Sequence, residues 1–159
     1  MDLTHFNDHG YARMVDVGEK PESQRIAIAQ ATVRMQASTL AAIKCGGVKK
    51  GDVLGVAQVA GVMAAKQTSN LIPMCHPLLL TSVDIIFEID EKNSSVQIEC
   101  QVQTTGKTGV EMEAISGASI AAMTIYDMTK SIDRWMTISD IKLIEKAGGK
   151  SGHLVRPYI

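Results

Sequence analysis

The chain has 159 residues and a mass of 17.1 kDa, which is the size of one domain. Its 16 Lys+Arg and 17 Asp+Glu residues give a formal net charge of -1, so it lacks the basic excess of a protein that coats nucleic acid. A hydrophobic content of 45% excludes a disordered acidic tail, and with only 4% aromatic residues the core must be filled by Ala, Val, Ile, Leu and Met.

In chain order, residues 14–17 predict a short edge strand. Residues 25–35 favour a longer strand, because isoleucine and alanine alternate at its start, although the alanines leave a helix possible. Ser38 is the expected N-cap of a short helix that runs to Cys45 and stops at Gly46.

A longer, alanine-rich helix is expected next, with Asp52 as its N-cap and its end near Asn70. The pattern then changes from helical to strand-like. Residues 81–90 and 94–104 are joined by residues 91–93, which predicts a β-hairpin.

The last third of the chain begins with a glycine-bounded turn at residues 105–109. Residues 110–133 show one broad apolar face at helical spacing, and residues 136–146 predict a final strand. Gly148 opens a glycine-rich tail.

The order strand, helices, strand, strand, helix, strand is typical of the split βαβ, or ferredoxin-like, arrangement. We therefore predict an α+β fold, with a four-stranded antiparallel sheet and helices packed on one face. No linker or repeat divides the sequence, so residues 1–159 are expected to form a single domain, with flexible ends at about residues 1–20 and 148–159.

The cysteines and the N-terminus bear on the compartment. Cys45, Cys75 and Cys100 are odd in number and widely spaced, which disfavours a disulfide framework and suits a reducing compartment. The N-terminus has no basic region before an apolar run, and the longest apolar stretch, residues 53–65, is too short to cross a bilayer. We expect a cytoplasmic protein without a membrane partner.

Two segments resemble phosphate-binding loops, residues 106–108 (GKT) and residues 149–151 (GKS). A Walker A loop requires a glycine five positions before its GK pair, and those positions hold Gln101 and Ile144. Neither segment is therefore a P-loop. Both remain glycine turns that can bring one lysine near an anion.

Residues 72–77 (IPMCHP) form a stiff loop, because each proline restricts its own φ angle and the residue before it. Such a loop can present His76 to a ligand in one orientation. Alternatively, Pro77 begins the next strand and His76 hydrogen-bonds a backbone carbonyl; the residues alone leave both interpretations open. The other histidines are scattered, and Cys75 lacks a second pair at zinc-ligand spacing, so no metal site is expected.

The helix predicted over residues 110–133 carries several charged side chains. Asp127 and Lys130 form an i,i+3 pair, which is common on exposed helix surfaces. Glu113 and Asp127 are fourteen residues apart, so they differ by about 40° around the axis but by about 21 Å along it. They therefore contact different ends of a long ligand, belong to different sites, or converge between symmetry-related subunits.

Six segments together resemble one family, cyclic pyranopterin monophosphate synthase, also called molybdenum cofactor biosynthesis protein C. They are MVDV (14–17), KKGDV (49–53), IPMCHPL (72–78), TGKTGVEMEA (105–114), TIYDMTK (124–130) and GGKSG (148–152). The resemblance runs along nearly the whole chain, in order and without a large insertion.

The resemblance implies a lyase of ferredoxin-like fold, for which we expect no cofactor. It also implies a homo-hexamer, a trimer of dimers, with active sites at subunit interfaces. The expected substrate is a cyclised GTP, 3',8-cyclo-7,8-dihydroguanosine triphosphate, which is converted to cyclic pyranopterin monophosphate with release of pyrophosphate.

The resemblance also assigns site residues. It implies that Asp127, Lys50 and Lys130 are catalytic. It implies substrate-binding roles for Met74, Cys75, His76, Met112, Glu113 and Lys146, and it transfers no role to His153.

These residue types suit the chemistry. We hypothesise that Asp127 and Lys130 handle the proton transfers on the base, while Lys50 and Lys146 hold phosphates. Two alternatives are an oligomeric nucleotide sensor without catalysis, which would tolerate loss of these residues, and a metal-dependent hydrolase, which would need a carboxylate cluster.

Overall fold

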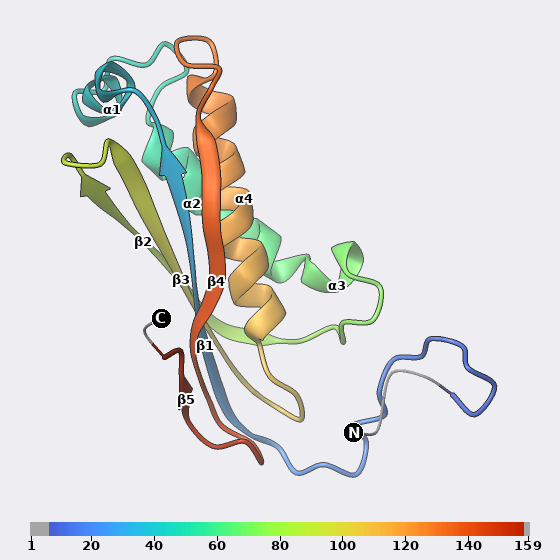
Figure 1. Ribbon diagram of the computed structural model, residues 1–159. Coiled ribbons are helices and arrows are strands. Elements are labelled where there is room, and N and C mark those ends of the chain that lie inside the picture. Colours follow the sequence, from blue (N-terminus) through green and yellow to red (C-terminus); the bar gives the residue numbers. More distant parts are fainter. Residues whose placement is uncertain (1–6, 158–159) are drawn as a thin grey trace.

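The computed structural model describes residues 7–157, which form one antiparallel sheet with helices against one face (Figure 1). Across the sheet the strand order is β2-β3-β1-β4-β5, and every neighbouring pair is antiparallel. The predicted α+β class and the split βαβ order are confirmed. In chain order the elements are β1 (Ser23–Arg34), α1 (Ala37–Lys44), α2 (Val53–Lys66), α3 (Thr68–Leu71), β2 (Leu80–Asp90), β3 (Ser95–Gly106), α4 (Glu111–Thr129), β4 (Thr137–Ala147) and β5 (Leu154–Val155).

The sheet has five strands rather than the predicted four. Residues 148–152 form a turn in which Gly148 and Gly152 have φ angles of 101° and 65°, a region that favours glycine. The chain then returns, and β5 pairs with Glu145 and Lys146 of β4. This part of the expected flexible tail is therefore an edge strand.

The strand β1 turns its alanines toward the helices. Ala27, Ala29 and Ala31 are fully buried, whereas Ile26 and Ile28 lie on the opposite face and are only partly buried. The helix α4 also contributes small residues at this contact, and their side chains let the helix lie close to the sheet. The buried small residues of α4 are Ala114, Gly117, Ala118, Ala121 and Ala122.

The helices α2 and α4 cross where two glycines face each other. A Cβ atom added to Gly61 would lie 2.8 Å from the carbonyl oxygen of Gly117, and one added to Gly117 would lie 2.5 Å from Sγ of Cys100. These distances leave no room for a side chain at either position. The crossing therefore fixes α4, which carries several candidate site residues, against both α2 and the sheet.

The predicted N-cap of α2 is confirmed, because the Asp52 side chain accepts a hydrogen bond from Gly55 N at 3.0 Å. The single helix predicted to run to about residue 70 is wrong. It is interrupted at Gln67, and the hydroxyl of Thr68 donates to the carbonyl oxygen of Ala65 at 3.0 Å. This bond satisfies one of the carbonyls at the end of α2.

The predicted N-cap of α1 is wrong. Gln36, not Ser38, precedes the helix, and its own side chain makes no capping bond. The carboxylate of Asp133 instead accepts from Gln36 N at 2.8 Å and from the Thr39 hydroxyl at 3.3 Å. The helix α4 ends at Thr129 rather than at the predicted residue 133, and Asp133 lies in the segment after it, where its side chain reaches α1.

The N-terminal part of the chain differs from the predictions. Residues 14–17 are not a strand but an irregular segment beside the loop that precedes β2. Residues 1–6, which belong to the expected flexible end, lie outside the described residues, as do residues 158–159. No helix within residues 7–157 is long and apolar enough to cross a membrane.

Candidate active site

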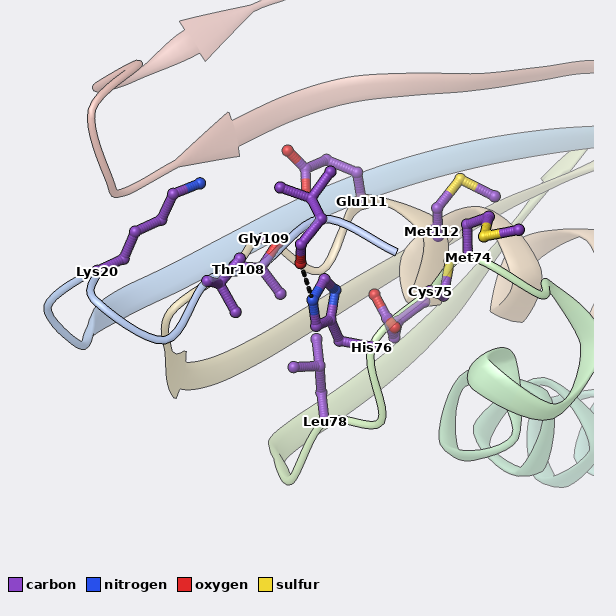
Figure 2. A pocket seen from close by; sticks show the side chains of 12 residues that line it. Lys20, Met74, Cys75, His76, Leu78, Thr108, Gly109, Glu111 and Met112 are labelled. Carbon is purple, nitrogen blue, oxygen red and sulfur yellow. Dashed lines mark hydrogen bonds between the residues drawn. The ribbon is translucent and has the colours of Figure 1, made fainter. Parts of the chain in front are cut away.

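The candidate residues fall into two groups at opposite ends of α4. At its start, Met112 and Glu113 face the loop that carries Met74, Cys75 and His76. These five residues, all predicted to bind substrate, line one cavity of about 330 Å³, which we call the His76 pocket (Figure 2). The structure therefore brings together two segments that lie far apart in the sequence.

His76 satisfies parts of both interpretations of its loop. Its Nε2 atom lies 2.7 Å from the carbonyl oxygen of Val15, and its side chain also lines the pocket. Pro77 does not begin a strand, because β2 starts at Leu80. The histidine is thus held by a backbone carbonyl while it faces the cavity.

Glu113 is buried, with a relative exposure of only 4% for the residue. Burial raises its pKa above the usual value, and the neighbouring charge of Glu111 raises it further. Burial also raises the pKa of the Cys75 thiol, with a second contribution from Glu113. Glu113 therefore holds a proton more tightly than an ordinary glutamate, whereas Cys75 is a poor nucleophile because its thiol stays protonated.

A second cavity, of about 530 Å³, adjoins the His76 pocket and shares Lys20, Thr108, Gly109 and Glu111 with it. We call it the basic cavity, because five cationic side chains and a single carboxylate line it. Such a surface is suited to a polyanion. The five cations are Lys20, Arg25, Lys107, Lys146 and Lys150.

Lys146 reaches the basic cavity from β4 and forms an ion pair with Glu111 at the start of α4. Both side chains are about three-quarters buried, with exposed fractions of 24% and 27%. Lys146, predicted to bind substrate, thus lines the basic cavity, and Glu111 holds it near the His76 pocket.

Arg25 and Lys20 were missed by the sequence reasoning, since neither belongs to a recognisable motif. The Arg25 guanidinium donates to the carbonyl oxygen of Lys107 at 3.3 Å. A Cβ atom added to Gly149 would overlap this guanidinium, so the glycine lets the turn at residues 148–152 pass directly over Arg25. The two glycine turns that follow β3 and β4 therefore meet at this cavity, each bringing one lysine.

The second group lies at the other end of α4, and we call it the Asp127 cluster. Asp127 Oδ2 lies 2.9 Å from Nζ of Lys50, and Oδ1 lies 2.6 Å from Nζ of Lys130. Lys50 also donates to the backbone oxygen of Asp127 at 2.7 Å. The three residues predicted to be catalytic are thus in direct contact, although they come from the loop after α1 and from the end of α4.

The two lysines set the protonation of the Asp127 cluster. Hydrogen bonds from Lys130 and then Lys50 lower the pKa of Asp127 to about 2. The carboxylate of Asp127 in turn raises the pKa of Lys130. At neutral pH the cluster therefore holds an ionised carboxylate beside a protonated Lys130.

The two groups do not meet within one copy of the chain. Glu113 and Asp127 are fourteen residues apart on α4, which corresponds to about 21 Å along a helix. Lys50 and Lys146, expected together on the phosphates, are likewise at opposite ends of α4. Within residues 7–157, no group of three or more His, Cys, Asp or Glu residues could hold a metal ion.

Comparison with known proteins covers nearly the whole chain. Residues 14–149 match the MoaC family. A cyclic pyranopterin monophosphate synthase of Syntrophomonas wolfei is 68% identical over 98% of this chain and 99% of its own length. Proteins of the same name from Desulfitobacterium hafniense and Listeria welshimeri are 60% and 59% identical, over 98% and 95% of this chain and 95% and 94% of their own lengths.

Proposed function

The chain belongs to the MoaC family and serves molybdenum cofactor biosynthesis as a cyclic pyranopterin monophosphate synthase, a lyase that acts on a GTP-derived substrate, and we propose how its two groups of residues carry out that reaction. The substrate in this proposal is 3',8-cyclo-7,8-dihydroguanosine triphosphate. The products are cyclic pyranopterin monophosphate and pyrophosphate.

This proposal rests on one observation: the His76 pocket and the basic cavity lie next to each other. The first has volume for a fused ring and a mixture of apolar and titratable walls, and the second is lined by five cations. Their volumes, about 330 and about 530 Å³, are within the range of small-molecule sites. The ring of the substrate fits the His76 pocket, and its triphosphate fits the basic cavity.

The phosphate step needs fixed positive charge. A ribose hydroxyl oxygen forms a bond to the α-phosphorus, and the bond from that phosphorus to the bridging oxygen breaks. Pyrophosphate leaves with the electron pair, and the hydroxyl proton passes to a base. Arg25, Lys107 and Lys146 can stabilise the negative charge that develops on the leaving group.

The ring step needs protons to be placed and removed. Burial raises the pKa of Glu113, and pairing with Asp127 raises the pKa of Lys130. Asp127 itself is a weak base, because its pKa is about 2. In this proposal Asp127 orients Lys50 and Lys130, and the lysines donate and accept the protons.

A complete site then requires two copies of the chain. In this proposal the Asp127 cluster of one copy faces the His76 pocket of another, within a homo-hexamer built as a trimer of dimers. Two exposed apolar side chains support this arrangement: Met123, which lines the same shallow cavity as Asp127 and is 56% exposed, and Trp135, in the segment between α4 and β4, which is 88% exposed. Exposed apolar side chains of this size are typical of subunit interfaces.

The direct test is turnover. Purified protein is incubated with the cyclised nucleotide, and pyrophosphate and the fluorescence of the oxidised pterin are measured together. We expect both products in equal amounts. Binding of the nucleotide without either product would contradict the reaction and favour the sensor alternative.

A further inference from the structure

The irregular segment at residues 13–20, which we call the N-terminal strap, lies against the His76 pocket. We propose that Val15 and Val17, the side of this strap that faces the pocket, are part of the active site and that the carbonyl of Val15 positions His76. The carbonyl selects the ring tautomer with a proton on Nε2, and it leaves Nδ1 as a base that faces the cavity. The base role rests on the proposed function, whereas the tautomer does not.

The hydrogen bond itself determines where the proton is. A carbonyl oxygen can only accept, so the Nε2 atom that lies 2.7 Å from Val15 O must carry the hydrogen. In a neutral imidazole the other nitrogen, Nδ1, is then bare and can accept a proton. Figure 2 shows this bond as a dashed line to one of the two ring nitrogens. Among residues 7–157, Nδ1 of His76 has no hydrogen-bond partner.

In the part of the chain that the structure describes, the strap is attached to the rest of the protein by side chains of the proposed substrate site and not by backbone hydrogen bonds to the sheet or the helices. Within the described residues, no backbone–backbone hydrogen bond joins residues 13–20 to the sheet or the helices. Two side-chain donors hold it instead, His76 to Val15 O and Lys107 to Gly18 O. His76 lines the His76 pocket and Lys107 lines the basic cavity, so both donors belong to the proposed substrate site.

The side chains of the strap alternate. Val15 and Val17 line the His76 pocket, whereas Met14 and Asp16 are exposed. This alternation is that of an extended segment with one face against the cavity. The MVDV segment (residues 14–17) was predicted to be an edge strand. Its two valines instead form part of the wall of the His76 pocket.

The pocket then holds a base and an acid. His76 Nδ1 can take a proton from a substrate N–H or hydroxyl, which makes the ring an imidazolium whose Nε2–H remains bonded to Val15 O. Burial raises the pKa of Glu113, so in its protonated form this residue can supply a proton elsewhere on the substrate. The two groups line one cavity, so both transfers can occur on a single ring.

The tautomer can be observed without substrate. In protein labelled with ¹⁵N-histidine, a long-range proton–nitrogen correlation spectrum distinguishes protonated from bare ring nitrogens, and His76→Gln assigns the signals. Above the pH at which the ring loses its charge, we expect a protonated Nε2 and a bare Nδ1. A protonated Nδ1, or signals averaged between the two tautomers, would overturn the proposal.

The coupling between strap and histidine is tested with matched variants. Val15→Ser/Val17→Ser removes the two side chains that seat the strap on the pocket, and Met14→Ser/Glu19→Ser makes the same number of changes on its exposed positions. The first variant should expose the strap to trypsin after Arg13, average the two tautomers and lower kcat about ten-fold. The second should do none of these.

A double-variant cycle separates positioning from simple loss of structure. His76→Gln should lower kcat about 100-fold, and adding Val15→Ser/Val17→Ser to it should lower kcat no further, because the strap acts through the histidine. Additive losses would overturn the positioning role. If wild-type protein shows the expected tautomer but makes no product, the proposed function fails while the assignment of the tautomer stands.

Discussion

Glu113 and Asp127 lie on the same helix, α4, and the fourteen residues between them place their carboxyl groups in separate cavities. Glu113 is buried among the walls of the His76 pocket, and Asp127 is exposed and paired with two lysines. The environments also shift the two pKa values in opposite directions. The same helix therefore presents a buried carboxyl group with a raised pKa at one end and a lysine-bound carboxylate at the other.

Lys50→Ala should abolish most turnover while the protein still binds the cyclised nucleotide. Loss of the lysine removes one of two cations on Asp127, and we expect kcat to fall about 100-fold or more. Lys44→Ala is the matched control, because Lys44 is also an exposed lysine in an ion pair, with Glu91, away from the cluster. Full turnover by Lys50→Ala would refute its role.

Arg25→Ala should weaken the binding of pyrophosphate, because Arg25 is one of the cations of the basic cavity. A hydrogen bond to a charged group contributes about 1.5–3 kcal/mol, so we expect a roughly ten-fold to 100-fold rise in Kd by titration calorimetry. Arg34→Ala changes the same residue type at the far end of the same strand and should leave the Kd unchanged. Equal effects of the two variants would rule out the basic cavity as the binding site.

Asp127 should titrate far below an ordinary aspartate. Its pKa of about 2 in the folded protein, against 3.8, means that its pairing stabilises the fold above pH 3.8 and that this stabilisation is lost as the pH falls through about 2. Carbon-13 titration of the carboxyl group measures the midpoint directly. Lys130→Ala should move the midpoint up toward 3.8, and Lys44→Ala should not. An unchanged midpoint in Lys130→Ala would contradict this origin of the low pKa.

Glu113→Gln should change how stability depends on pH. The pKa of Glu113 is raised above 4.5 in the folded protein, so the folded state binds this proton more tightly than the unfolded state. The wild-type free energy of unfolding therefore carries a contribution that falls as the pH rises past 4.5. Glu113→Gln lacks that contribution, so its stability relative to wild type should increase with pH in denaturant titrations. Glu19→Gln, an exposed position, should follow the wild type.

Features decided by neighbouring residues were predicted from the sequence. Asp52 caps α2 because its side chain reaches Gly55 only three positions away, and the hairpin of β2 and β3 follows from alternation and a short loop. The grouping of Met74, Cys75 and His76 with Met112 and Glu113 came instead from the family resemblance. No local pattern in those segments indicates that they meet.

Features decided by distant partners were missed. Asp133 caps α1 across 97 positions of sequence, and no spacing rule identifies such a pair. Arg25 looks like any strand residue until the turn at residues 148–152 passes over it. A strand of two residues, β5, is too short to show alternation and depends on its pairing with β4.

The central claim is that one active site needs the Asp127 cluster of one copy and the His76 pocket of another. It is tested most directly by mixing two inactive variants, Lys50→Ala and Glu113→Gln, after unfolding and refolding them together at equal concentration. If the sites form between copies, the Asp127 cluster and the His76 pocket of each site come at random from either variant. A site is active only when its cluster comes from Glu113→Gln and its pocket from Lys50→Ala, so turnover should recover to about a quarter of the wild-type value. If both halves of a site come from the same copy, the refolded mixture should remain as inactive as either variant alone, and that result would contradict the account.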